Sequence, residues 1–362
     1  MTIYYILYIY IITIAQLSTK FDDNLYKKKK TVNTYVFLFV FLLLALRHWS
    51  MGVDLGYTNR YNTGYIQSFE TLAKYSWGEI IALKEFLHYE KGYVIFNKLV
   101  SSIYSNRQFF LGVCAFVGIL PVAILINRNS SLPSLSWFIF LGLPVFLIHY
   151  SGLRQGISIG IIAYSMKWIE NRNKISFILA VLLASTFHSS AIIFLLAYPL
   201  YHLRLSNLTK VISTVIILIV YFFRKPLFQF FSRMFKENTT ITDSNSITLF
   251  LVFVLIYIFL LFFTTYKDEK SGYINLFWFA CICQAFSNIY TIAMRVGYYF
   301  MLGLIIALPN TLMNIRQNTM NGEKNFRIYY LLISSAFILF GLYSFANGTW
   351  SMTNPYIFFW QK

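Results

Sequence analysis

The chain is 362 residues long, 58% hydrophobic and 20% aromatic. Only 12% of its residues are charged, well below the roughly one-quarter found in soluble domains. This composition excludes an ordinary soluble domain and indicates an integral membrane protein. The net charge of +17 does not indicate nucleic-acid binding, because Lys and Arg lie in short gaps between apolar runs and not in water-facing clusters.

Apolar runs follow one another along almost the whole chain. A span needs about 20 mainly apolar residues, or somewhat fewer where flanking residues snorkel to the interface. The first run has no preceding basic residues and no small-residue cleavage site, so we expect a retained span and not a cleaved signal peptide. In chain order the twelve candidate spans lie near 2–17, 33–47, 108–127, 134–150, 153–169, 174–188, 189–203, 209–223, 246–265, 273–292, 294–312 and 328–347.

The longest polar connection, 47–107, joins the second candidate span to the third. Within it, 93–105 is apolar but short and carries Asn97 and Lys98, so we expect an amphipathic interfacial or re-entrant helix there. The sequence shows no repeat of fixed period and no Gly/Ser linker. We therefore expect an all-α integral membrane protein with about 12 transmembrane helices, forming a single polytopic domain over 1–362.

Loop charge predicts the orientation of these spans, because Lys and Arg in short loops are retained in the cytoplasm. The first loop carries Lys20 and the lysine run 27–30, so we place it inside and the N-terminus outside. Alternation then places five further loops inside. These six inner loops hold more than half of the chain's 30 Lys and Arg residues, which supports the assignment. The long loop 47–107 accordingly lies on the outer side.

With this orientation, polar residues from four connections and from the C-terminal segment reach the outer side. They are Arg47 with Asp54, then Glu90, Arg154, His188, Arg295 and Tyr356. Gln284, Asn288, Thr291 and Arg295 also form a polar stripe at helical spacing, which runs from the span 273–292 into the beginning of the next. A stripe of this kind in a membrane faces protein or a water-filled cavity and not lipid. Together these residues predict one polar pocket that opens to the outside.

The run that follows Arg154 has two different faces. Gly152, Gly156 and Gly160 recur every four residues, so they form a small-residue track along which a neighbouring helix can approach closely. Arg154 and Ser158 lie on another face. We expect the glycine face to pack against a helix and the other face to open inward.

Arginines at such a pocket suit a lipid-linked anionic substrate, because guanidiniums bind phosphate oxygens with paired donors and stabilise a departing pyrophosphate. A carboxylate or His accepts the proton of an attacking hydroxyl, and Asp54, Glu90 and His188 all qualify. The outer side has no D-x-D motif and no His/Cys cluster, so we expect metal-independent glycosyl transfer without a cofactor. Tyrosines of the long loop, among them Tyr57 and Tyr61, offer flat faces for sugar rings.

Each of these residues also has a simpler interpretation. An arginine at a helix end, such as Arg47, Arg154 or Arg295, can snorkel to lipid phosphate. His188 lies among Ser and Thr residues and can cap a polar turn. The functional interpretation therefore depends on several of these groups meeting in space.

Several short motifs occur in a fixed order between residues 47 and 356. They are Arg47 with Gly52 and Asp54, Glu90 with Tyr93, L-R-Q-G at Arg154 and Gln155, F-H-S-S at His188, R-x-x-x-Y-F at Arg295 and Tyr299, and a late P-Y at Tyr356. In this order they resemble the EpsG/Wzy-type family of bacterial polysaccharide polymerases. The family usually has G-T-D where this chain has G-V-D, and Glu-Pro where it has Glu90-Lys91.

The resemblance implies a glycosyltransferase-C-like enzyme of the bacterial cytoplasmic membrane that joins oligosaccharide repeat units on undecaprenyl pyrophosphate at the outer face. Arg154 and Arg295 would hold the pyrophosphate, and Arg47 would assist them or order the long loop. Further substrate contacts are expected from Gln155, Tyr57, Tyr61, Asn288, Tyr299 and Tyr356. The expected partners are the lipid-linked oligosaccharide and membrane lipid, with a flippase and a chain-length regulator of the same pathway.

Two other classes of function stay open at this point. A flippase or exporter of lipid-linked oligosaccharide is less consistent with the sequence, because transporters commonly carry internal repeats and midplane charges. A glycan ligase shares the arginine-rich pyrophosphate site and differs only in its acceptor, and an O-acyltransferase is a related alternative. The sequence does not distinguish the acceptor.

Overall fold

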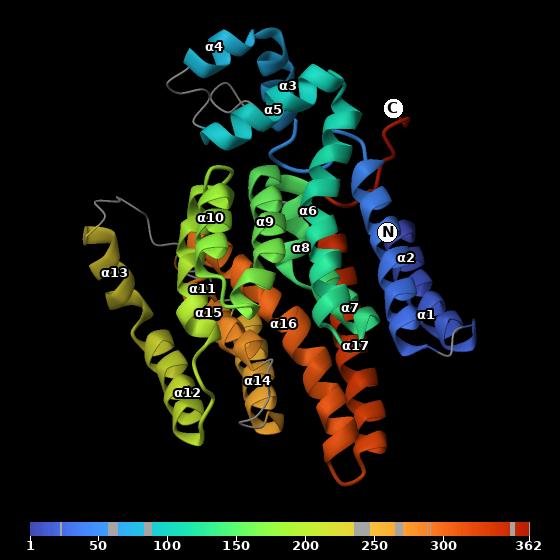
Figure 1. Ribbon diagram of the computed structural model, residues 1–362, viewed down its shortest axis with the longest axis vertical. Helices are drawn as coiled ribbons and strands as arrows, with labels where there is room; N and C mark the ends of the chain where they lie inside the picture. Colours follow the sequence, from blue (N-terminus) through green and yellow to red (C-terminus); the bar gives the residue numbers. More distant parts are fainter. Residues whose placement is uncertain are drawn as a thin grey trace. The chain divides into compact units, whose positions relative to one another are not determined.

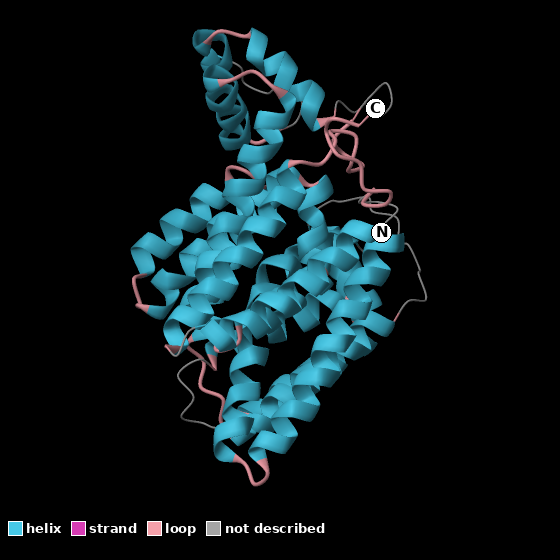
Figure 2. Cartoon of the chain, turned by 90° about the vertical axis from the view of Figure 1, so that its right-hand side faces the viewer, coloured by secondary structure: helices cyan, strands magenta, loops and turns pink. Residues whose placement is uncertain are grey.

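The computed structural model is α-helical, with one 3-10 helix and one isolated β-bridge between Arg47 and Phe358 as the other regular elements in the ranges it describes (Figure 2). The predicted all-α class is therefore confirmed for these ranges. The residues that the structure describes are 1–21, 24–56, 64–82, 89–234, 247–264, 271–287, 289, 291–347 and 352–361.

The chain divides into two compact units, residues 1–192 with 331–362 and residues 193–330, and each is described by itself. The first contains α1 (Thr2–Phe21), α2 (Leu25–Ala45), α3 (Tyr65–Lys74), α4 (Trp77–Ala82), α5 (Lys91–Ile103), α6 (Arg107–Asn129), α7 (Pro133–Gly142), α8 (Pro144–Ser151), α9 (Leu153–Glu170) and α10 (Lys174–Ser185) (Figure 1). The second contains α11 (Ala197–Tyr201), α12 (Asn207–Phe222), α13 (Arg224–Met234), α14 (Thr248–Phe263), α15 (Gly272–Ala285) and α16 (Thr291–Asn318). The 3-10 helix η1 (Ser189–Leu196) and α17 (Gly322–Asn347) cross the boundary.

Three of the described helices are long and apolar enough to cross a membrane, namely Arg107–Asn129, Ala293–Asn318 and Gly322–Asn347. Two bent pairs raise this number to five if each pair is one span: α7 with α8, bent by 63°, and α12 with Arg224–Phe230, bent by 76°. Several other apolar helices are 10–17 residues long. The chain is thus a multi-pass membrane protein, while the total of about twelve spans stays a prediction.

The connection 47–107 contains helices. Its described part forms α3, α4 and α5, and α5 lies where the sequence predicts a short helix at 93–105. α5 buries Tyr93, Asn97 and Val100 on one side, so it is amphipathic. The location of this connection on the outer side of the membrane stays a prediction.

The expected span 134–150 is interrupted at a proline. Leu143 has an extended backbone, with φ −85° and ψ 149°, because the ring of Pro144 disfavours the α conformation in the residue before it. Pro144 then begins α8, where its missing N–H leaves no helical hydrogen bond unmade. After α8, Gly152 alone separates it from α9. This short junction places Arg154 in the first turn of α9.

α9 packs closely against α6 at Gly160, whereas Gly152 and Gly156 face Ile148 and His149 of α8; α6 and α9 lie side by side in Figure 1. A Cβ atom at Gly160 would clash with the carbonyl oxygen of Val117 and crowd Gly118 of α6. A residue with a side chain therefore does not fit at Gly160 unless the helices separate. The structure confirms the close approach expected at this position.

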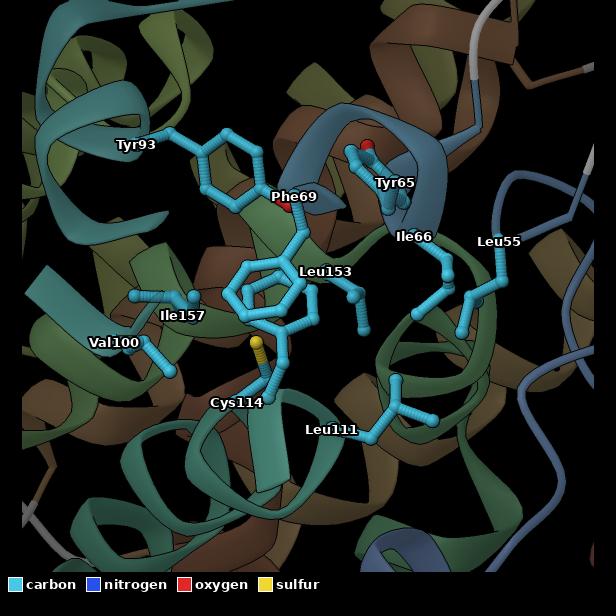
Figure 3. Packing of buried hydrophobic residues seen from close by; sticks show 11 residues of the cluster. Leu55, Tyr65, Ile66, Phe69, Tyr93, Val100, Leu111, Cys114, Leu153 and Ile157 are labelled. Atoms are coloured by element: carbon cyan, nitrogen blue, oxygen red, sulfur yellow. The ribbon is translucent and has the colours of Figure 1, made fainter. Parts of the chain in front are cut away.

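Buried side chains from the long connection pack onto the ends of α6 and α9. In Figure 3 the side chains of Phe69, Cys114 and Leu153 converge from three different helices. The cluster consists of Leu55, Tyr65, Ile66, Phe69, Tyr93, Val100, Phe110, Leu111, Cys114, Leu153 and Ile157. Burying a large apolar side chain contributes about 1.5–3 kcal/mol relative to exposure, so this cluster fixes α3 and α5 in place.

A late segment of the chain pairs with the residues that follow α2. The N–H of His48 donates to the carbonyl oxygen of Ile357 at 2.7 Å, and the N–H of Phe359 donates to that of Leu46 at 2.9 Å. The hydroxyl of Tyr356 donates to the carbonyl oxygen of Leu43 at 2.8 Å. These bonds fasten the beginning of the long connection.

Candidate functional site

Arg154 is held in a fixed orientation at the beginning of α9. Its Nε donates to the Tyr65 hydroxyl at 3.2 Å, and its Nη1 forms an ion pair with Glu90. About 22% of the Arg154 side chain is exposed, so the guanidinium is accessible without being freely mobile. α3 and the residue before α5 thus orient a cation carried by α9.

Glu90 lies directly before α5 and is bound from two sides. One carboxylate oxygen pairs with Arg154, and the other accepts a hydrogen bond from the N–H of Ser189 at 2.9 Å. Burial alone would raise the pKa of Glu90, but the Ser189 N–H and the charge of Arg154 together hold it below its ordinary value. Glu90 is therefore a charged carboxylate near neutral pH.

Aromatic rings surround the Arg154 guanidinium. Its Cζ atom lies 4.7 Å from the centroid of the Tyr89 ring and 5.9 Å from that of Tyr65. The two rings stack with centroids 5.8 Å apart, and Tyr93 meets both edge-on. Burial raises the pKa of Tyr65 to about 12, so its hydroxyl stays protonated. Cation–π contacts of this kind add to the fixed orientation of Arg154.

The F-H-S-S turn lies against the beginning of α5. The N–H of Tyr93 donates to the carbonyl oxygen of Thr186 at 3.3 Å, and Ser189 reaches Glu90 as described. His188 begins this turn, and its Nδ1 lies 3.0 Å from the Ser190 hydroxyl. The structure thus brings three of the motifs together, those of Glu90, Arg154 and His188. The catalytic roles of these residues stay predictions.

Asp54 lies next to the same cluster. Its carbonyl oxygen accepts a hydrogen bond from the N–H of Tyr65 at 2.9 Å, and its carboxylate is exposed and close enough to raise the pKa of Tyr65. Two residues earlier, Gly52 has a φ of +124°, a conformation that residues with a side chain rarely adopt. This backbone conformation explains why the G-V-D motif has a glycine at position 52.

Arg47 is buried, in contrast to Arg154. It is 1% exposed, its Cζ lies 4.8 Å from the Tyr150 ring centroid, and its backbone forms the bridge to Phe358. Its Nε and Nη1 have no hydrogen-bond partner among the residues that the structure describes. The backbone bridge joins the beginning of the long connection to the late segment of the chain, and the ordering of the loop by Arg47 stays a prediction. Its expected contact with pyrophosphate stays a prediction.

The remaining predicted site residues fall into three groups. Gln155 is buried beside Arg154, and Tyr356 lies on the segment that pairs with the Arg47 region. Arg295 and Tyr299 belong to the second unit, where Arg295 is exposed and Tyr299 is fully buried. Three others, Tyr57, Tyr61 and Asn288, lie outside the described residues.

Two contacts of Arg154 and one of Glu90 did not follow from the sequence. Arg154 contacts Tyr65 and Tyr89, which are two of many tyrosines in the long connection, and Glu90 accepts from the N–H of Ser189, which is a backbone group. The position of Tyr89 directly before Glu90 was the one available signal. Their contacts depend on how α3 and α5 fold back over α9, which no local pattern encodes.

Comparison with protein-family models gives a match to the model described as EpsG family, over residues 30–358. This range contains every residue predicted for the site. No curated protein and no solved structure matches the chain.

Proposed function

Since this chain belongs to the EpsG family, we propose that it is a polysaccharide polymerase that joins undecaprenyl-pyrophosphate-linked oligosaccharide repeat units. The transfer takes place at the outer face of the bacterial cytoplasmic membrane. The growing chain moves from its own lipid carrier to the incoming lipid-linked unit. A flippase that supplies this unit and a regulator of chain length are the proposed partners.

The orientation of Arg154 is the observation that carries this proposal. Tyr65 and Glu90 engage Nε and Nη1, and no other hydrogen bond of Arg154 occurs within the described part of the chain. A guanidinium has five N–H donors, so donors on Nη1 and Nη2 remain for a ligand. Phosphate oxygens accept paired bonds from such an edge. A guanidinium held in advance loses little freedom when it binds them.

In the proposed reaction, a hydroxyl oxygen of the acceptor unit attacks the anomeric carbon of the donor's reducing-end sugar. The new C–O bond forms while the bond from that carbon to the pyrophosphate oxygen breaks. Undecaprenyl pyrophosphate leaves with the electron pair, and the Arg154 donors stabilise the charge that develops on it. Arg295 is the proposed second pyrophosphate ligand. No metal is required for this charge stabilisation.

The proton of the attacking hydroxyl passes to a general base. Glu90 is poorly suited, because a carboxylate whose pKa is held low by two donors accepts a proton weakly. We therefore assign Glu90 to positioning Arg154. Asp54, which is exposed next to the cluster, and His188, on the turn that binds Glu90, remain the candidate bases.

Arg154→Ala in the producing cell tests the proposal. Single repeat units should accumulate on the lipid carrier at the outer face, because units arrive there but are not joined. Arg128→Ala is the matched control, since Arg128 of α6 also pairs with a glutamate, Glu170 at the end of α9, at 3.3 Å and away from the Arg154 cluster. Its polymer should have normal length. Lipid-linked units trapped inside the Arg154→Ala cell would indicate a flippase, and full-length polymer would remove Arg154 from the mechanism.

A further inference from the structure

A groove of about 490 Å³ lies in the first unit between α6, α9 and α10. Its lining is almost entirely apolar and includes Val117 of α6, Ile161 and Tyr164 of α9, and Leu179 and Leu183 of α10. The last two side chains are 61% and 53% exposed, so the groove is open along its side. Of the three helices that form its walls, α9 packs against both α6 and α10.

This groove is continuous with the packing beneath Arg154. Val117 and Ile161 line it and also pack against the buried cluster that holds Tyr65 and Tyr93. Ile161 follows Arg154 by two helical turns, so it lies on nearly the same face of α9 and about 10 Å further along its axis. A chain that begins at the Arg154 guanidinium and follows α9 therefore enters the groove.

The other end of the groove is formed by aromatic residues with a cation. Tyr164 and Trp168 line it there, and the Lys167 ammonium lies 3.6 Å and 4.4 Å from their ring centroids. Aromatic rings and a lysine in this combination are typical of the boundary between hydrocarbon and headgroups. Trp168 lies about 21 Å from Arg154 along the helix, most of the roughly 30 Å hydrocarbon core. The groove thus lies at the depth of the acyl chains.

We propose that this groove binds the polyprenyl chain of the lipid-linked substrate. The inference rests on the proposed function, in which Arg154 holds the pyrophosphate that begins this chain. The chain gains no hydrophobic energy on leaving the lipid, because acyl tails are as apolar as the groove. Its gain is packing against three walls together with attachment to a headgroup already bound at Arg154. The effect on affinity is therefore modest.

Filling the groove tests this assignment in the purified full-length protein in nanodiscs. Leu183→Trp and Leu179→Trp should raise KM about five- to tenfold for the undecaprenyl-linked unit and leave kcat unchanged. A geranyl-linked unit, with its much shorter chain, should retain its KM. Leu182→Trp is the matched control, because Leu182 is 43% exposed on the same helix and does not line the groove. Equal KM values for all three variants with the undecaprenyl unit would overturn the groove assignment.

Cross-linking gives a readout that does not depend on turnover. A benzophenone amino acid at position 179 should label with radioactive undecaprenyl pyrophosphate, and excess unlabelled undecaprenyl pyrophosphate should compete. Equal competition by phosphatidylglycerol would show ordinary annular lipid and overturn the proposal. The proposal would also be overturned if the tryptophan variants lose turnover with both the undecaprenyl-linked and the geranyl-linked unit, and if the protein that carries only the benzophenone shows no labelling that undecaprenyl pyrophosphate competes away. If the benzophenone protein is labelled as expected but the protein joins no units, the proposed polymerase function fails and the groove assignment stands.

Discussion

The variant Glu90→Ala tests whether Glu90 positions Arg154 or acts as the general base. In Glu90→Ala, Arg154 loses its ion pair and keeps the hydrogen bond to Tyr65. The two side chains of the pair are about one-fifth exposed, so its contribution lies between that of an exposed pair, about 0.2–1 kcal/mol, and that of a buried pair whose partner is removed, about 3–5 kcal/mol. An intermediate loss of about 1.4–2.8 kcal/mol in transition-state stabilisation corresponds to a 10- to 100-fold fall in kcat/KM.

The double variant decides between the two roles. Arg154→Ala alone should lower kcat/KM about 10²–10³-fold, as expected for loss of a donor to developing charge. If Glu90 acts through Arg154, adding Glu90→Ala to this variant lowers kcat/KM little further, because no guanidinium is left to position. An independent base would instead multiply the two losses. The assay is the initial rate of joining of a synthetic undecaprenyl-linked unit by purified protein.

If the losses of kcat/KM from the two single variants multiply in the double variant, the positioning role is refuted and Glu90 is again a candidate base. The comparison holds only for folded variants, so each is checked by its thermal unfolding midpoint in detergent. Glu90→Gln adds a further check. Its amide oxygen can still accept from Arg154 or Ser189, so its loss of kcat/KM should be smaller than that of Glu90→Ala.

Three further predictions concern single groups. Tyr65→Phe removes the acceptor of the Arg154 Nε hydrogen bond and should raise the activation free energy that determines kcat/KM by about 0.5–1.5 kcal/mol. The Tyr93 hydroxyl does not bind Arg154 in the described structure, so Tyr93→Phe should change kcat/KM little. Gly160→Val should force α9 away from α6 and lower the free energy of unfolding by about 1–3 kcal/mol. Gly112→Ala should be tolerated, because a Cβ atom there makes an ordinary 3.9 Å contact. Equal melting temperatures of the two variants would contradict this prediction. Because the pKa of Glu90 is lowered in the folded protein, its carboxylate contributes stability that is fully present above the ordinary pKa of 4.5 and is lost as the pH falls through the folded-state pKa. The stability of Glu90→Gln should therefore depend less on pH below pH 4.5, as measured by thermal unfolding.

The helical class and the meeting of three motifs followed from the sequence for physical reasons. Long apolar runs in a membrane protein satisfy their backbone groups as helices, and loop charge placed Glu90, Arg154 and His188 on one side. That they lie together is visible in the bond from Ser189 to Glu90. The prediction that these three residues lie on the same side required no knowledge of tertiary contacts.

Other features depended on contacts between distant parts of the chain. The sequence predicts one span over 134–150, and the 63° bend within it depends on how α7 and α8 pack. The ion pair of Glu90 with Arg154 joins residues 64 positions apart. Arg47 was expected to bind substrate or order the loop, and its burial depends on a segment that begins more than 300 residues later. Neither contact has a local signature in the sequence.

The pairing of residues 46–48 with residues 357–359 has a consequence for biosynthesis. The two paired segments are separated by most of the polypeptide, so the ribosome must translate past residue 359 before they meet. Until then, the beginning of the long connection lacks its fastening partner. Closure of this corner is therefore a late step in the maturation of the protein, after the helices between the two segments have been translated.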